Sequence, residues 1–241
     1  MKTYRFAALA LVALMSISSL AQAQRPQGRQ QGKGHGPGKG QGQSALANLP
    51  IEDLNDFEKE SLLLMREEEK LARDVYLELG KTYDLPVFSN IPRSEQRHLD
   101  QMGLLLERYG LEDPMLKESG QFTSPELQKL YQTLVAEGQK SEVAALKVGA
   151  TIEDLDIYDL EKALDGQVDN QDITLVYRNL AKGSRNHMRA FMAQLKTHEA
   201  TYEAQYIAQA DLDAIVASEW ERGPADGKKG RGRGRGQQRG K

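Results

Sequence analysis

The feature that most constrains the fold is a helical period in the apolar residues, which continues through most of residues 54–198. Apolar side chains three and four positions apart lie on one face of an α-helix. In residues 54–79 this stripe consists of Leu62, Met65, Ala72, Tyr76 and Leu79. No stretch shows the sustained alternation with β-branched residues that is typical of strands. The sequence therefore predicts an all-α fold.

Capping and helix-breaking residues divide this pattern into four long helices and two short ones. We expect Gly80 and Pro86 to end the first long helix. The second is expected to begin near Pro92 and to end before Gly110, which stands at the C-cap position. A Ser-Pro pair at 124–125 is a start signal for a short helix. The expected helices are 54–79, 92–109, 125–139, 141–165 and 172–198, with a further short helix at 211–220.

The lengths of the predicted connections indicate how these helices are arranged. About 13 residues join the first two long helices, and a short turn around Gly166 joins the last two. The central connection has about 31 residues and contains the short helix. A long crossover between two helical hairpins is typical of ferritin-like bundles. We therefore predict a ferritin-like four-helix bundle with a long central crossover that carries a short extra helix.

Three segments are expected to lie outside this bundle. In residues 1–23, Lys2 and Arg5 precede an apolar run that ends in Ala21-Gln22-Ala23. This pattern predicts a secretory signal peptide, cleaved after Ala23, rather than a membrane anchor. Residues 24–43 and 222–241 have too little apolar surface to bury, which predicts disordered tails. The folded domain is thus expected at 44–221, in a protein exported to the periplasm or the extracellular space.

Charge is divided between the predicted domain and its tails. Residues 44–221 contain 18 basic and 34 acidic residues, whereas both tails are basic. We consider the tails as binding sites for an anionic surface or polyanion, or as segments without a specific partner. Nucleic acid is a poor candidate because no aromatic residues are interleaved with the basic ones. The chain has no cysteine, which excludes disulfides, thiolate zinc sites and iron–sulfur clusters.

Each long helix carries an acid or a histidine within its apolar stripe. Burying several carboxylates without cations is very unfavourable. Carboxylates and imidazoles are suitable ligands for iron, which we expect first, and for manganese or zinc. A Glu-x-x-His pair projects both side chains from one helix face toward the same point. The sequence therefore predicts a metal site with the ligands Glu69, Glu95, His98, Glu153 and His187, and with Asp156 and Glu68 as further candidates.

Taken alone, each of these signals has a structural alternative. The run at 67–69 is three consecutive glutamates and could be a solvated charge run. His187 could be an ordinary core histidine. Asp156 and Asp159 could face water on an acidic helix, and a single Glu-x-x-His arises readily by chance. The metal site is favoured because a polar residue recurs within the stripe of all four long helices.

The runs that contain these residues resemble a known family. They read ESLLLMREEEKLARDVYLELG, PVFSNIPRSEQRH, LKVGATIEDLDIYDLEKAL and VYRNLAKGSRNHMRAF. These runs are similar to the domain of unknown function DUF2202, a family without an established activity that is placed in the ferritin-like superfamily. The resemblance covers roughly residues 55–195. It implies a ferritin-like fold and a dinuclear metal site.

More distantly, the runs resemble rubrerythrin-type di-iron proteins, whose motif over four helices is Glu, Glu-x-x-His, Glu, Glu-x-x-His. This resemblance implies that Glu69 and Glu153 bridge two irons. It implies that His98 and His187 are terminal ligands, with Tyr76 close to the ligands but not bound to the metal. It also implies redox activity toward peroxide or oxygen, with non-catalytic metal handling as the alternative function.

Ser184 is a departure from this motif, which has a glutamate three residues before the last histidine. A hydroxyl is a poorer ligand for a divalent metal than a carboxylate. Ser184 is therefore expected near the ligands rather than among them. The site is either mononuclear or dinuclear, with Asp156 as a substitute ligand or as an acceptor that orients a histidine.

Overall fold

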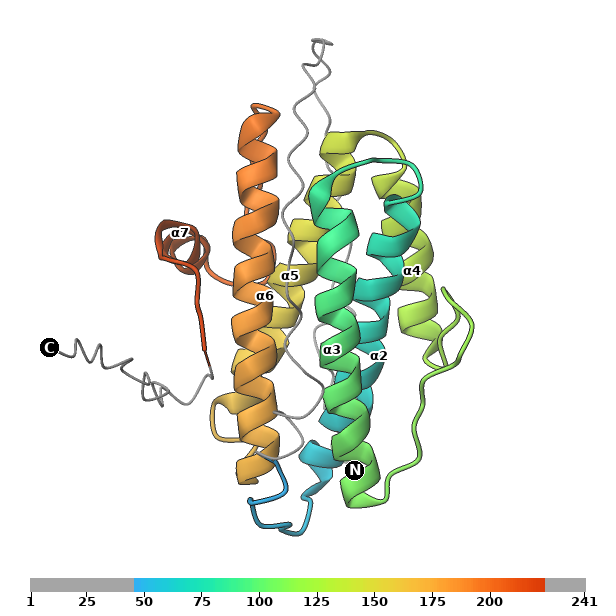
Figure 1. Ribbon diagram of the computed structural model, residues 1–241, viewed down its shortest axis with the longest axis vertical. Coiled ribbons are helices and arrows are strands. Elements are labelled where there is room, and N and C mark those ends of the chain that lie inside the picture. The colour runs from blue at the N-terminus through green and yellow to red at the C-terminus, as the bar shows by residue number, and fades with distance from the viewer. Residues whose placement is uncertain (1–45, 224–241) are drawn as a thin grey trace, which may run out of the picture.

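The computed structural model describes residues 46–223, and all regular structure in this range is helical (Figure 1). The helices are α2 (Asp56–Leu79), α3 (Pro86–Tyr109), α4 (Pro125–Gly138), α5 (Glu142–Leu164), α6 (Gln171–Thr197) and α7 (Gln209–Ala217). The prediction of an all-α fold is confirmed. No helix within 46–223 is both long enough and apolar enough to span a bilayer. The predicted signal peptide and nearly all of both predicted tails lie outside the described residues.

Four long helices form the bundle as two antiparallel hairpins. Helix α2 packs on α3, and α5 packs on α6. The hairpins meet along two seams, one between α2 and α5 and the other between α3 and α6 (Figure 1). The crossover at 110–141 carries α4, which packs against both α2 and α5. The predicted four-helix bundle with a helix in its long crossover is confirmed, while membership in the ferritin-like superfamily stays a prediction.

Local capping explains where several helices begin and end. Asn55 caps α2: its side chain accepts a hydrogen bond from the backbone N–H of Glu58, and the Glu58 carboxylate accepts one from the N–H of Asn55. Ser124 caps α4 as predicted, and the proline after it occupies the first helical position. Gly110 ends α3 with a φ of 64°, a backbone conformation that glycine adopts without strain. The signals at Ser124 and Gly110 were predicted from the sequence, whereas the cap at Asn55 was not.

The predicted start of α3 was wrong. The helix begins at Pro86 rather than Pro92, so the connection from α2 is only residues 80–85. Pro92 inside the helix removes a backbone hydrogen bond and costs about 3 kcal/mol. The added turn buries Val87, Phe88 and Ile91, and each such side chain contributes about 1.5–3 kcal/mol on burial. Packing of this turn therefore outweighs the cost of the internal proline.

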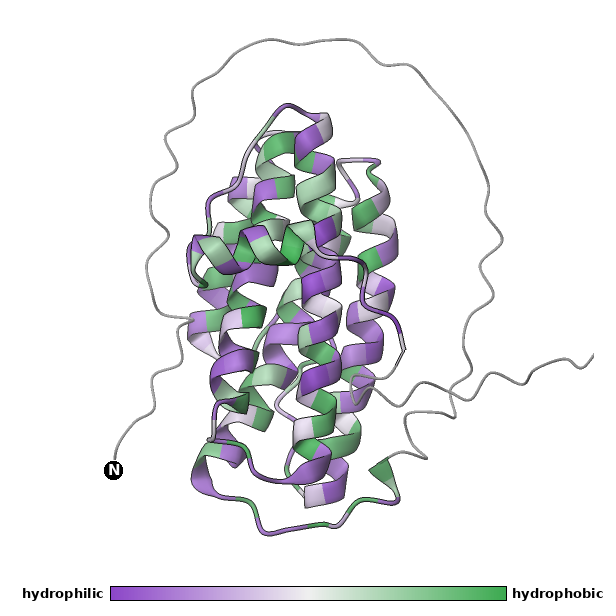
Figure 2. Cartoon of the chain, turned by 90° about the vertical axis from the view of Figure 1, so that its left-hand side faces the viewer, coloured by the Kyte–Doolittle hydropathy of each residue, from purple (hydrophilic) through white to green (hydrophobic). Residues whose placement is uncertain are grey.

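Helix α7 lies outside the bundle, against α6, with its axis across the bundle (Figures 1 and 2). It is shorter than the predicted 211–220 helix. The Arg189 guanidinium on α6 donates to the carbonyl of Ile215 at 2.9 Å, to Ser218 Oγ at 2.6 Å and to Glu221 Oε1 at 3.1 Å. These contacts fix the end of the described chain on the surface of α6.

Several buried acids hold the loops to the bundle by accepting hydrogen bonds from backbone N–H groups. The backbone donors come from 169–170 to Glu58, from 123–124 to Glu67 and from 205–207 to Asp154. Such hydrogen bonds compensate a buried carboxylate for the water that it has lost. Hydrophilic residues are interspersed with hydrophobic ones along the helices of the bundle (Figure 2).

Candidate metal centre

The five predicted ligands are all buried and meet between the four long helices. Glu69 comes from α2, Glu95 and His98 from α3, Glu153 from α5 and His187 from α6. They form two groups, one of Glu69, Glu95 and His98 and the other of Glu95, Glu153 and His187. Within each group the potential ligand atoms lie within 4.8 Å of one another. The helices thus bring together the five side chains that the sequence singled out.

Glu95 belongs to both groups. Its Oε2 lies 2.8 Å from His98 Nδ1, and its Oε1 lies 2.7 Å from His187 Nδ1. The two imidazole rings are stacked, with centroids 5.7 Å apart. The di-iron resemblance implied that Glu69 and Glu153 bridge two irons, which stays a prediction; the residue common to both groups in the structure is Glu95. A carboxylate with one oxygen directed to each histidine is suited to join two ions.

The other two glutamates lie at opposite ends of the cluster. Glu69 Oε2 is 3.1 Å from His98 Nδ1, and Glu153 Oε2 is 3.5 Å from His187 Nδ1. The hydroxyl of Tyr76, which is fully buried, donates to Glu153 Oε1 at 2.6 Å. This bond fixes the orientation of Glu153 and leaves its second oxygen directed toward the histidine. Tyr76 thus lies where the sequence placed it, beside a predicted ligand.

Only part of the cluster is hydrogen-bonded: His98 Nδ1 and Glu69 Oε2 form a hydrogen bond at 3.1 Å. Glu95 Oε1, Glu153 Oε2 and His187 Nδ1 are buried and make no hydrogen bond. Two ligands of one transition metal, each about 2.1 Å from it and at a right angle, lie about 3 Å apart. The N···O separations of 2.7–3.5 Å in this cluster match that spacing. The residues present therefore fit one or two divalent ions.

Burial and charge together set the protonation of this cluster. Burial raises the pKa of Glu69 to about 7, against the attraction of His98. Burial alone would raise the pKa of Glu95, but His187 and His98 together hold it well below its usual range. Burial would lower the pKa of His98, yet Glu69 and Glu95 raise it to about 10. Without a metal, His98 is therefore protonated at neutral pH, and a metal ion has to displace this proton.

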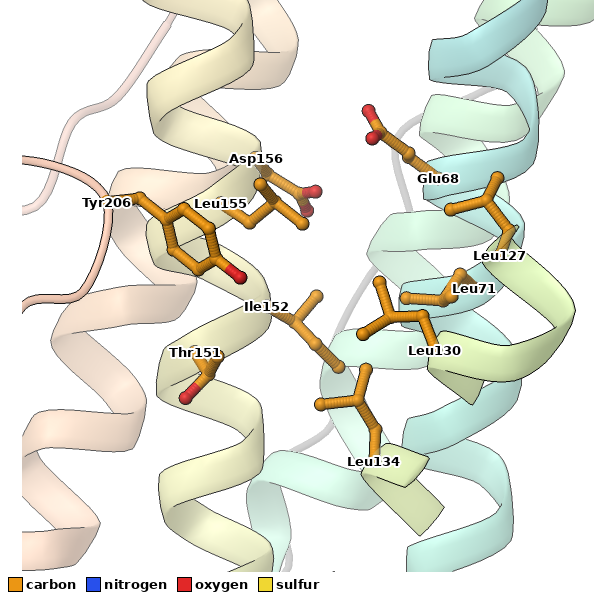
Figure 3. A pocket seen from close by; sticks show the side chains of 10 residues that line it. All are labelled: Glu68, Leu71, Leu127, Leu130, Leu134, Thr151, Ile152, Leu155, Asp156 and Tyr206. Carbon is orange, nitrogen blue, oxygen red and sulfur yellow. The ribbon is translucent and has the colours of Figure 1, made fainter. Parts of the chain in front are cut away.

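Glu68 and Asp156, the two further candidates, lie on the α2/α5 seam beneath α4. They line a cavity of about 10 Å³, whose other walls are largely apolar (Figure 3). Both oxygens of the Glu68 carboxylate are buried without a hydrogen bond. Burial raises its pKa well above the usual value, and the charges of Asp159 and Glu69 add to this effect. Neither Glu68 nor Asp156 belongs to the two groups of converging ligand atoms.

The structure rejects two of the alternatives drawn from the sequence. Residues 67–69 are not a solvated charge run, because all three glutamates are at most 5% exposed. Asp156 and Asp159 do not face water, since their exposed fractions are 6% and 0%. Four acids within residues 153–159 of α5 and three at 67–69 of α2 are therefore buried, which only tertiary packing could reveal.

Ser184 takes no part in the cluster. Its hydroxyl donates to the carbonyl of Leu180, one turn earlier in the same helix, at 3.2 Å. The residue before it, Gly183, was missed by the sequence analysis. A Cβ atom at Gly183 would lie 2.5 Å from Cε1 and 2.6 Å from Nε2 of His98. A glycine inside a long helix was the available signal, because it marks a close approach of another group.

Comparisons with known proteins find one family and similar proteins without an assigned function. Residues 58–219 match the model of a family described as uncharacterized protein domain DUF2202. The chain is 52% identical over 179 residues to uncharacterized protein MJ0754 of Methanocaldococcus jannaschii, which covers 74% of this chain and 96% of that protein. It is also similar to the crystal structure of hypothetical protein MJ0754 from Methanococcus jannaschii. That similarity has a TM-score of 0.70 at 51% identity and covers 72% of this chain and 99% of the other.

Proposed function

This chain belongs to the uncharacterized DUF2202 family, and we propose that it is an exported, ferritin-like protein that binds two transition-metal ions in its bundle core. The observation that carries the proposal is the convergence of buried carboxylate and imidazole atoms, of which Glu95 Oε1, Glu153 Oε2 and His187 Nδ1 have no hydrogen-bond partner. Leaving buried polar atoms without partners costs about 1–3 kcal/mol each, and more for charged groups. Bound cations would remove this cost.

Each residue has a definable part in holding the ions. Glu69 and His98 would bind one ion, Glu153 and His187 the other, and Glu95 would join them through its two oxygens. Mixed carboxylate and imidazole ligands suit iron first, with manganese or zinc as alternatives. Such an ion supplies Lewis acidity or, for iron and manganese, one-electron redox chemistry. Hydrogen bonds to ligands, such as the one from Tyr76, typically change metal affinity by about 10–100-fold.

Three protein ligands for each ion leave coordination positions open. Structural metal sites are normally closed by four protein ligands, whereas catalytic sites keep a position for water or substrate. Ser184 in place of the expected glutamate contributes to this openness, because its hydroxyl is bonded to its own helix. We therefore favour redox activity toward peroxide or oxygen over storage. Metal-dependent consumption of many peroxide molecules per bound ion, with an external reductant supplied, distinguishes the two, because storage consumes an oxidant only in proportion to the ions stored.

The proposal is tested by metal content, measured by elemental mass spectrometry after anaerobic reconstitution with iron, manganese or zinc. We expect about two ions per chain, close to none in Glu95→Gln and about one in Glu69→Gln. Glu107→Gln, an exposed position on the same helix as Glu95, is the control and should keep both ions. A parent protein without metal, or a Glu95→Gln variant with full metal content, would refute the proposal.

Export stays a prediction, because residues 1–23 lie outside the described part of the chain. N-terminal sequencing of the protein recovered from the periplasm or the medium tests it. A mature chain that begins at Gln24 is expected if cleavage follows Ala23. Recovery from the cytoplasm with Met1 retained would reject the prediction.

A further inference from the structure

A groove of about 1030 Å³ runs along the α3/α6 seam, on the side of the bundle away from α4. Its walls are one stripe of each helix, from Pro86 to Gln101 on α3 and from Leu175 to Gln194 on α6. At 1.5 Å per residue, the stripe on α3 is about 22 Å long. His98 and His187 both line the groove, so the groove leads to the candidate metal centre.

The volume of the groove indicates the size of what it binds. A water molecule takes about 30 Å³ of liquid, and peroxide or dioxygen is of similar size. Sites for organic ligands with the dimensions of a drug or cofactor have volumes of about 300–1000 Å³. The groove lies at the upper end of that range and would be far too large for a diatomic substrate alone.

The charge of the groove is opposite to that of the domain. Residues 44–221 have 34 acidic against 18 basic side chains. Among the described residues that line the groove there is no aspartate or glutamate, whereas Arg97 lines it from α3 and Lys182 from α6. Arg97 donates to the hydroxyl of Ser94 at 3.2 Å, and Lys182 to the carbonyl of Gly223 at 2.6 Å. A basic groove in an acidic domain attracts anions.

The remaining walls combine apolar side chains with uncharged polar ones. Val87 and Ile91 line the groove from α3 and Leu175 from α6, with amide side chains interspersed. Trp220 lies at the rim, where 54% of its surface is exposed. An exposed tryptophan beside an aliphatic wall favours the apolar part of a ligand.

We propose that the α3/α6 groove binds an elongated organic anion, with its acidic group at Arg97 and Lys182 and its apolar body along the aliphatic wall. The inference rests on the proposed function in one respect: the bound molecule comes within reach of the metal ligands His98 and His187. It gives the protein an organic substrate or effector in addition to a small oxidant. Binding itself requires only the groove.

Trp220 provides the measurement, because it is the only tryptophan in the chain and lies at the groove. The full chain, freed of metal by chelation, is titrated with octanoate, octanol and octylammonium, which share an alkyl chain and differ in charge. We expect octanoate to change the Trp220 fluorescence saturably and at lower concentration than octanol. Octylammonium is expected to give no saturable change. Equal responses to octanoate and octylammonium would overturn the proposal.

A matched pair of variants locates the binding. Arg97→Gln removes a groove cation and is expected to weaken octanoate binding about tenfold, as for the loss of one charged hydrogen bond. Arg93→Gln removes the same charge one turn earlier on α3, at an exposed position outside the groove, and is expected to leave the affinity unchanged. Equal affinities in the two variants would overturn the proposal.

Repeating the titration with metal-loaded protein separates the two hypotheses. Metal binding without an octanoate response would reject the groove proposal and leave the metal site intact. Octanoate binding without metal uptake would reject the metal site and keep the groove. Sedimentation of the same samples tests whether a second copy of the chain occupies the groove instead. A dimer with a buried Trp220 and no octanoate response would show that it does, and would overturn the proposal.

Discussion

The two seams of the bundle are built alike and differ in what covers them. Each joins two long antiparallel helices. Along the α2/α5 seam, α4 packs over the joint and leaves a cavity of about 10 Å³. Along the α3/α6 seam there is a groove of about 1030 Å³, with no helix of the described chain packed over it. The path of the crossover therefore decides from which side the core can be reached.

The same difference separates the acids at 67–69 on α2. Glu67 accepts hydrogen bonds from the crossover backbone, Glu68 is closed beneath α4 without one, and Glu69 is directed toward His98. Three identical side chains thus anchor a loop, occupy a sealed seam and approach the candidate metal centre. Successive residues of a helix point about 100° apart, so the three carboxylates meet different parts of the surrounding structure.

The largest expected effect comes from opening the closed seam. Leu127→Ala removes an α4 side chain that is 1% exposed and lines the cavity at the closed seam, and should lower the free energy of unfolding by about 2–5 kcal/mol. Leu175→Ala truncates the same residue type at the open groove, where it is only partly buried, and should cost less than about 1 kcal/mol. Urea denaturation measures both. Equal losses would remove the distinction between the seams.

The next effect tests the space behind His98. Gly183→Ala places a Cβ atom against the imidazole ring and should destabilise the protein by about 1–3 kcal/mol through overpacking, with loss of the ion bound by His98. Gly103→Ala on α3 meets only the Arg66 guanidinium, at 3.4 Å, and should be neutral or stabilising by up to about 1 kcal/mol. Thermal unfolding and metal content are the measurements. Full metal content in Gly183→Ala would contradict this account.

A smaller effect on the free energy of unfolding is expected at Glu67 and Glu68 of α2, with opposite signs at the two residues. At pH 8 and without metal, Glu68→Gln should stabilise the protein by about 1–2 kcal/mol, because folding no longer has to protonate this carboxylate or bury it without a hydrogen-bond partner. Glu67→Gln should destabilise it by about 1 kcal/mol because it weakens the bonds to the crossover. Urea denaturation gives both values, and the same sign in both variants would refute the comparison.

The pH dependence of the same experiment follows from the raised pKa of Glu68. The folded state holds the Glu68 proton more tightly than the unfolded chain does, so its contribution is fully present below about pH 4.5 and is lost as pH rises toward the folded pKa. His98, with its pKa raised to about 10, acts in the same direction from about pH 6.5 upward. The metal-free parent should therefore be less stable at pH 8 than at pH 5, and Glu68→Gln should reduce this difference.

The smallest expected effect is the release of protons on metal binding. His98 is protonated below its raised pKa, so an ion that binds its Nδ1 displaces roughly one proton. The apparent affinity should rise with pH between 6 and 9. Calorimetry in buffers of different ionisation enthalpy counts the protons. An affinity independent of pH would mean that the ion does not bind this imidazole.

The sequence was sufficient to predict the five buried side chains of the candidate metal centre. It was not sufficient to predict the groove beside them. Polar residues within apolar stripes identified the five side chains of the cluster, because the helical period alone places them inward. The sharing of Glu95 was not predictable, since it depends on how α3 faces α5 and α6. The groove was not predicted either: Arg97 and Trp220 are far apart in the chain and ordinary by composition. Pro92 misplaced a helix start because tertiary packing outweighed a local rule.

The position of the first ligand group in the chain has a consequence for the order of folding. Glu69, Glu95 and His98 all belong to the α2–α3 hairpin, whose contacts are local and form early. The second group also needs α5 and α6, beyond the crossover, and so must wait for a longer loop to close. An ion captured by the nascent hairpin would leave Glu95 Oε1 directed outward. The α5–α6 hairpin would then dock onto an α2–α3 hairpin whose ligands are already oriented by the bound ion.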